Sequence, residues 1–170
     1  TMMLGSVTTA FAAGSPASGK APVKQEAATS TSGATVNTNT KGQATVTSVK
    51  KTNSTEVRIG SVSVKGTKYA VTRIESKTFA NAAKAEKVVL PNTLKSIGAE
   101  AFTGAKSLKT IVIKSKTTVK VNKDAFKNVD TKKMTIKVTQ NMSLAQYKAF
   151  KKQLRAAGFK GTIKRVTVGK

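Results

Sequence analysis

Residues 88–110 read VVLPNTLKSIGAEAFTGAKSLKT, and residues 111–134, which follow directly, read IVIKSKTTVKVNKDAFKNVDTKKM. In each segment a short β-type run comes first, then an isolated aliphatic residue, then an Ala-Phe pair: Ala101-Phe102 and Ala125-Phe126. Similarity between consecutive segments is typical of repeat proteins, in which each repeat packs only against its neighbours. The two segments therefore predict a fold built from stacked repeats.

The same features recur on both sides of these segments. The phenylalanines are separated by 23, 24 and 24 residues, at Phe79, Phe102, Phe126 and Phe150. An aliphatic residue lies five positions before each of the first three, at Ile74, Ile97 and Val121. Alternating aliphatic pairs complete the pattern, at Val88/Leu90, Ile111/Ile113 and Ile136/Val138. Since one repeat cannot bury its apolar edge alone, we expect equivalent residues to stack in one continuous core closed by caps.

The fullest repeat resembles the BspA-like leucine-rich repeat family of bacterial surface proteins. The resemblance extends from about Glu56 to Val168 and is carried by Leu90-Pro91, Leu94, Ile97-Gly98, Ala101-Phe102, Gly104 and Leu108. The usual Cys position of the family holds Ala82, Ala105 and Val129 here, which fits a small buried site. The resemblance implies an α/β repeat fold, namely a short right-handed leucine-rich-repeat solenoid of about three to four repeats.

Both flanks of the repeats carry signals for further elements. Val62–Val64 and residues 69–71 surround a turn containing Gly66, which predicts an N-terminal β-hairpin. At the other end, Asn141 or Ser143 can N-cap a helix that ends before Gly158. We expect this capping helix to cover the last repeat with one apolar face, formed by Leu144, Tyr147, Phe150, Leu154 and Ala157. A short strand over residues 162–168 should follow.

Composition divides the chain into three parts. Residues 1–12 are apolar and end in Ala10-Phe11-Ala12, which resembles a signal-peptide remnant; a mildly apolar, disordered terminus is the alternative. Residues 13–44 are rich in Ala, Ser and Thr with few large aliphatics, which predicts a disordered linker. Residues 45–170 form the predicted leucine-rich repeat domain with its caps. No stretch offers the ~20 apolar residues of a transmembrane helix.

Residue counts exclude most catalytic chemistry. The 170 residues contain no His and no Cys, so zinc sites, thiol nucleophiles and histidine bases are absent. Only seven Asp and Glu are present. Glu100 with Asp124 could reach a Ca²⁺ ion across adjacent repeats, but exposed repeat positions explain both residues better. We expect a protein that is not an enzyme, with no cofactor and no metal.

The first candidate binding surface is the concave face of the repeat sheet. Residues that alternate with the buried aliphatic pairs should point outward there. The candidates are Lys87, Val89, Thr110, Val112, Lys114, Thr135 and Lys137. We expect Val89 and Val112 to form an exposed apolar pair suited to protein contact; strand propensity alone is the competing explanation for these valines.

The second candidate surface is cationic. The chain has 31 Lys and Arg and a formal net charge of +24, and eleven of these cations follow Asp130, the last acidic residue. The candidates for polyanion binding are Lys148, Lys151, Lys152, Arg155, Lys164 and Arg165. Nucleic acid is disfavoured because aromatic residues do not alternate with the lysines. A Lys-rich surface that only keeps the protein soluble is the competing explanation.

Together these features predict a secreted, extracellular binding module. Association of this module with the cell wall is one option. The family resemblance implies adhesion at the cell surface and recognition of host matrix or surface proteins through the concave face. The alternative function is a cationic binder of anionic cell-envelope or matrix polymers, such as teichoic acid, sulfated glycan or anionic lipid. The sequence leaves the oligomeric state open.

Overall fold

The computed structural model describes residues 23–27, 34–50, 53–64 and 66–167. The proposed signal-peptide remnant, residues 1–12, lies outside the described residues. Within the described ranges the elements are β1 (Val23–Ala27), β2 (Ala34–Thr38), β3 (Gln43–Val49), β4 (Glu56–Arg58), β5 (Val62–Val64), β6 (Thr67–Ile74), β7 (Lys87–Leu90), β8 (Ser96–Ile97), β9 (Thr110–Ile113), β10 (Lys120–Val121), β11 (Thr135–Thr139), α1 (Leu144–Ala156) and β12 (Thr162–Val166).

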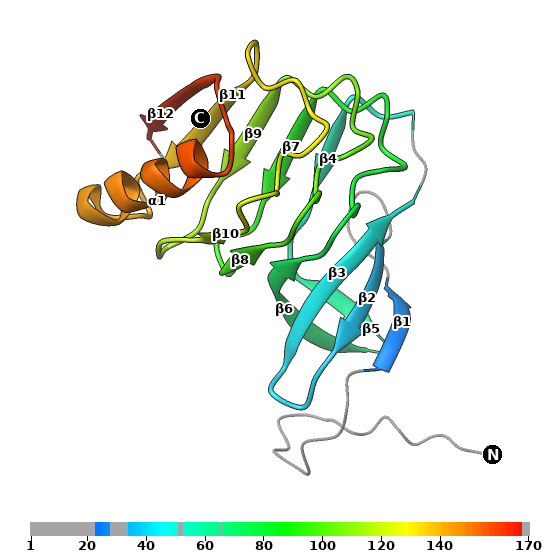
Figure 1. Cartoon of the computed structure of the whole chain (residues 1–170). Helices are drawn as coiled ribbons and strands as arrows, with labels where there is room; N and C mark the ends of the chain where they lie inside the picture. The colour runs from blue at the N-terminus through cyan, green and yellow to red at the C-terminus, as the bar shows by residue number, and fades with distance from the viewer. Residues whose placement is uncertain (1–22, 28–33, 51–52, 65, 168–170) are drawn as a thin grey trace, which may run out of the picture.

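The strands form two sheets (Figure 1). A five-stranded sheet has the order β12-β11-β9-β7-β4, and all its strands are parallel. A seven-stranded sheet has the order β1-β2-β3-β6-β8-β10, with β5 paired to β6. From β7 to β11 the chain passes back and forth between the two sheets, so each repeat gives one strand to each. This confirms the predicted repeat fold with a parallel sheet.

The predicted aliphatic ladders line the interior between these sheets. Ile74, Ile97 and Val121 are register partners across β6, β8 and β10. The alternating pairs are likewise aligned across β7, β9 and β11, with Val88, Ile111 and Ile136 in one row. All of these side chains are buried. Equal spacing in the sequence thus places equivalent residues on top of each other, as the repeat requires.

A column of aromatic rings runs along the core. Phe79 and Phe102 are stacked with ring centroids 5.3 Å apart, and Phe102 and Phe126 are stacked at the same distance. The fourth ring is Phe159, which is tilted and 5.2 Å from Phe126. The prediction that Phe150 continues the series is therefore wrong. Phe150 lies on α1 and is fully buried in the core outside the column of rings, so its spacing of 24 residues is a coincidence.

The prediction of a disordered linker over residues 13–44 is wrong for part of that range. Val23–Ala27 forms β1, which pairs antiparallel with β2, and β2 pairs antiparallel with β3. Ala34 and Val36 of β2 are completely buried. The average composition of residues 13–44 hides a local alternation of buried and half-buried positions over Ala34–Thr38. Pairing with β3 supplies the apolar surface that this strand lacks alone.

The predicted β-hairpin is present. Val62, Ser63 and Val64 of β5 pair antiparallel with residues 67–69 of β6. Gly66 lies in the turn with φ +85°, a conformation that glycine adopts without steric cost. The hairpin is one part of a larger N-terminal β unit, because β6 also pairs with β3.

Helix α1 caps the C-terminal end of the repeats. Ser143 is the N-cap and forms a capping box with Gln146, and Gly158 follows the helix with φ +91°. Phe150, Leu154 and Ala157 are buried, but Leu144 is 51% exposed, so the predicted apolar face is shorter than expected. Leu144 is in the first turn, where the helix extends past the repeat core.

The aromatic column should dominate the stability of the repeats. We expect Phe102→Ala to lower the free energy of unfolding by about 3–5 kcal/mol, because the ring is fully buried between two others. Leu144→Ala, at an exposed position, should change it by less than about 0.5 kcal/mol. Urea denaturation followed by circular dichroism measures both values. Equal effects of the two substitutions would contradict the role of the column.

Gln153 of the cap helix satisfies a backbone group of the edge strand β10. Its Oε1 atom accepts a hydrogen bond of 2.8 Å from the Val121 amide. We expect Gln153→Ala to lower the free energy of unfolding by about 1–3 kcal/mol, because it leaves this partly buried N–H group without a hydrogen-bond partner. Helix propensity would change stability in the opposite direction, since Ala is the better helix former. Gln140→Ala, at an exposed loop position, is the control.

The measurement is urea denaturation together with hydrogen exchange at the Val121 amide. Exchange at Val121 should accelerate in Gln153→Ala and stay unchanged in Gln140→Ala. Unchanged exchange at Val121 in the helix variant would show that the side chain does not protect the strand edge.

Candidate functional site

The outward face of the five-stranded sheet brings most of the predicted site residues together. Strand register aligns one row across the sheet, consisting of Glu56, Lys87, Thr110, Thr135 and Thr162. A second row consists of Arg58, Val89, Val112, Lys137 and Lys164. Lys114 directly follows β9 at the carboxyl end of the sheet. The predicted neighbours on this face are therefore neighbours in the structure.

The prediction that Val89 and Val112 form an exposed apolar pair is wrong. Their side chains are only 4% and 3% exposed. Each valine contacts the other as a register partner, and the pair is flanked in its row by Arg58 and Lys137. Long cationic side chains cover apolar neighbours with their methylene stems while the charged ends stay in water. The accessible chemistry of this face is consequently that of Thr, Lys and Arg.

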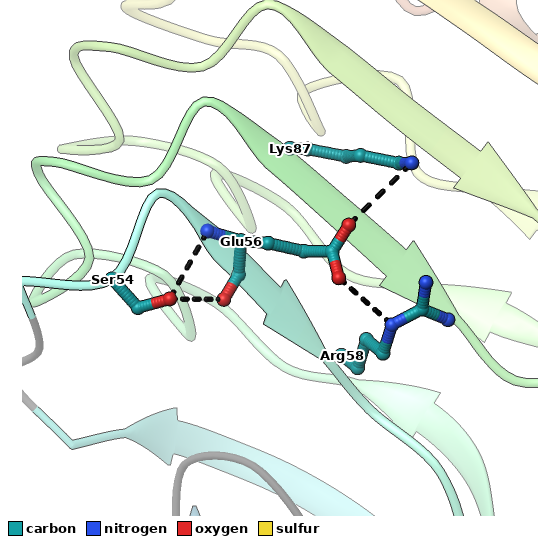
Figure 2. A network of polar contacts seen from close by, with 4 residues as sticks. All are labelled: Ser54, Glu56, Arg58 and Lys87. Carbon is teal, nitrogen blue, oxygen red and sulfur yellow. Dashed lines mark hydrogen bonds and ion pairs between the residues drawn. The ribbon is translucent and has the colours of Figure 1, made fainter.

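Glu56 is the centre of a polar network at the β4 edge of this face (Figure 2). Its Oε1 atom accepts a hydrogen bond of 2.8 Å from Arg58 Nε, and its Oε2 atom lies 3.4 Å from Lys87 Nζ. Ser54 Oγ accepts from the Glu56 amide and donates to the Glu56 carbonyl oxygen, which fixes the start of β4. The carboxylate therefore holds one cation from its own strand and one from the neighbouring strand.

This network lowers the pKa of Glu56 below the ordinary value of a glutamate. Desolvation by burial acts in the opposite direction, but the hydrogen bonds and charges of Arg58 and then Lys87 outweigh it. Because the pKa is lower in the folded state, the network stabilises the protein above the unfolded pKa. That contribution is lost as the pH falls through the folded pKa. Glu56 is accordingly ionised at neutral pH.

A cavity of about 710 Å³ opens beside this network, at the carboxyl ends of β4 and β7. Its walls come from both sheets: Arg58, Val89 and Lys114 belong to the repeats, whereas Lys68 and Gly42 belong to the N-terminal β unit. Of the predicted site residues, only Val89 and Lys114 line it. The sequence interpretation missed Arg58 and Lys68. Val57 between Glu56 and Arg58 was the available signal, because it continues the aliphatic ladder into β4.

The predicted cationic surface divides into two groups. Lys148, Lys151 and Lys152 on α1 and Lys164 on β12 are exposed. Two arginines instead bind the backbone: Arg155 Nη1 donates to the carbonyl oxygens of Phe159 and Gly161, and Arg165 Nη2 donates to that of Met142. Both arginines thus hold the cap in place, while the lysines and the exposed Arg155 carry accessible charge.

Over the described ranges, no cluster of three or more His, Cys, Asp or Glu side chains could hold a metal ion. Over the same residues, no helix is long and apolar enough to cross a membrane.

The chain matches a known protein family and is similar to solved structures of bacterial proteins. A family model described as "BspA type Leucine rich repeat region (6 copies)" matches residues 72–168. Among solved structures, the chain is similar to a leucine-rich repeat protein from Bacteroides capillosus, with 24% identity over 67% of this chain and 72% of that one, and a TM-score of 0.44. It is also similar to a leucine-rich cell surface protein from Faecalibacterium prausnitzii, with 20% identity over 82% of this chain and 32% of that one, and a TM-score of 0.43. The comparison with curated proteins found no match.

The Glu56 network can be tested by titration. We expect the pKa of the Glu56 carboxyl, measured by carbon-detected NMR, to lie below the ordinary value of a glutamate, because two cations favour its charged form. Arg58→Gln should raise its pKa towards the ordinary value. Arg73→Gln, which removes the partner of Glu75 elsewhere on the surface, should leave it unchanged. An unaltered Glu56 titration in Arg58→Gln would contradict the assignment.

Proposed function

Because the chain belongs to the BspA-type leucine-rich repeat family, we propose that it is a secreted, non-enzymatic binding protein that recognises host matrix or surface proteins through the outward face of its five-stranded sheet. In this proposal the repeats form a short right-handed solenoid of about three to four repeats, with that sheet on the concave side. The protein acts in adhesion at the bacterial cell surface, where its positive charge keeps it near the anionic cell wall.

The observation that carries the proposal is the alignment of like residues across the outward face. Thr110, Thr135 and Thr162 stand next to one another in one row, and Lys137 and Lys164 stand next to one another in the other. These strands contribute their opposite faces to the core, and the Thr and Lys residues of the outward rows are half-buried or exposed, so they can reach a partner. A regular, polar and cationic surface supported by parallel strands is rigid, which limits the entropy lost on binding.

The second candidate function is binding of anionic cell-envelope or matrix polymers through the C-terminal cap. Its supporting observation is the group of exposed lysines Lys148, Lys151, Lys152, Lys160 and Lys164. No acidic residue follows Asp130. Such a surface attracts polyanions over a distance set by the salt concentration.

Retention on immobilised fibronectin, heparin and teichoic acid distinguishes the two functions. Binding through the outward face should weaken much less between about 0.1 M and about 1 M salt than binding through the cap, which should be lost as the screening length falls from ~10 to ~3 Å. The outward-face variant combines Thr110→Glu and Lys137→Glu. The matched cap variant combines Lys148→Glu and Ala149→Glu, with the same change in net charge at exposed positions of α1.

We expect the outward-face variant to lose retention on fibronectin by about tenfold or more, and the cap variant to retain it within about twofold. The reverse result, with salt-sensitive retention on heparin or teichoic acid, would establish the second candidate instead. A chain that is retained on none of the three supports would contradict both.

A further inference from the structure

The cavity at the carboxyl ends of β4 and β7 differs in chemistry from the rest of the surface. It lies where the repeats meet the N-terminal β unit, so its lining combines residues of the repeats with residues that no repeat supplies. Its lining is formed by Gly42, Arg58, Ile59, Gly60, Ser61, Lys68, Ala70, Val89, Leu90, Pro91, Asn92, Thr93 and Lys114. The segments contributing to it are the β2–β3 turn, the end of β4 with the β4–β5 connection, β6, the end of β7 with the loop after it, and the residue after β9.

Three cations and no acidic residue line this cavity. They come from three different segments, with Arg58 at the end of β4, Lys68 near the start of β6 and Lys114 after β9. Arg58 Nε donates a hydrogen bond to Glu56 on the same strand, and this bond orients the Arg58 guanidinium group. In the part of the chain that the structure describes, neither Lys68 nor Lys114 forms an ion pair. The lining therefore carries an excess of positive charge.

The remaining lining is mostly apolar. Ile59, Ala70, Val89 and Pro91 give the lining its apolar atoms, whereas the Leu90 side chain is fully buried in the core. Asn92 and Ser61 add polar groups, while the Thr93 hydroxyl already donates to the Val71 carbonyl oxygen. An apolar wall together with a few convergent polar or charged groups is the usual composition of a small-molecule site. The volume, about 710 Å³, falls within the range of such sites.

We propose that this cavity binds a small organic carboxylate, with the carboxyl group held by Lys68, Lys114 and Arg58 and an apolar body against Ala70, Val89 and Pro91. Cations in a concave site focus their field on the interior, which favours an anion over a neutral ligand of the same shape. The apolar wall contributes further affinity that an inorganic anion cannot gain. The lining contains no aromatic ring, so nothing in it would stack a nucleobase. This inference does not depend on the adhesion function proposed above.

The test uses the full chain and 3-phenylpropionate as the probe, monitored by amide NMR titration. The amide resonances of Gly60, Asn92 and Lys114 should shift saturably. The neutral analogue 3-phenylpropionamide and inorganic phosphate should each bind about tenfold more weakly, because each lacks one of the two recognised features. Equal affinity for the amide or for phosphate would overturn the proposal.

Substitutions assign the charges. Lys68→Gln with Lys114→Gln should weaken 3-phenylpropionate binding by about tenfold or more, since charge-assisted hydrogen bonds are lost. The control pair Lys148→Gln with Lys152→Gln removes the same charge from the cap and should leave binding unchanged. Circular dichroism of each variant verifies folding. Absence of saturable shifts in the unmodified chain, or equal weakening by both pairs, would show that the cavity is not a carboxylate site.

Discussion

Each repeat of this chain leaves an apolar edge that only the next repeat can cover, and the structure follows from that requirement. The clearest expression is the column of rings from Phe79 through Phe102 and Phe126 to Phe159, in which neighbouring centroids are 5.2–5.3 Å apart. The turns of adjacent repeats also lie close together. Gly104 has φ +97°, and a Cβ atom there would come within 2.9 Å of the Ala80 Cα atom. Close stacking thus determines both the large and the small residues of the repeat.

The two ends of the column are sealed by different elements because they expose different groups. At the N-terminal end, β3 pairs in parallel with β6, so the sheet of the repeats continues into the antiparallel strands β1 and β2. At the C-terminal end, α1 lies beside the short strand β10, and β12 extends the other sheet. The segment between α1 and β12 is held by Arg155, which donates hydrogen bonds to the carbonyl oxygens of Phe159 and Gly161. Gly161 itself lies so close to the Met134 carbonyl oxygen that no side chain would fit.

The sequence predicts correctly the features that depend on the spacing of the repeats. It does not predict those that depend on contacts with other strands. The rows of Ile74, Ile97 and Val121 follow from spacing alone, as does the outward direction of Val89 and Val112. Whether an outward valine is exposed depends on its neighbours in adjacent strands, such as Arg58 beside Val89 and Lys137 beside Val112, which alternation within one strand does not reveal. For the same reason, spacing favoured Phe150 as the fourth ring. Only the path of the chain after α1 brings Phe159 to that place. The strand Ala34–Thr38 was missed because it is stabilised by β3 rather than by its own composition.

The same distinction separates the two candidate sites. The outward face is built from equivalent positions of successive repeats, so the pattern of the sequence predicts which residues meet there, although not their exposure. The cavity is built where repetition ends. Lys68 and Gly42 come from the N-terminal β unit, and Arg58 belongs to the one repeat strand that the sequence interpretation left outside the ladder. A surface of repeated Thr and Lys can hold an extended partner without selecting one point along it. A single cavity that joins non-equivalent residues has a definite position and shape, and a binding site for one small ligand needs both.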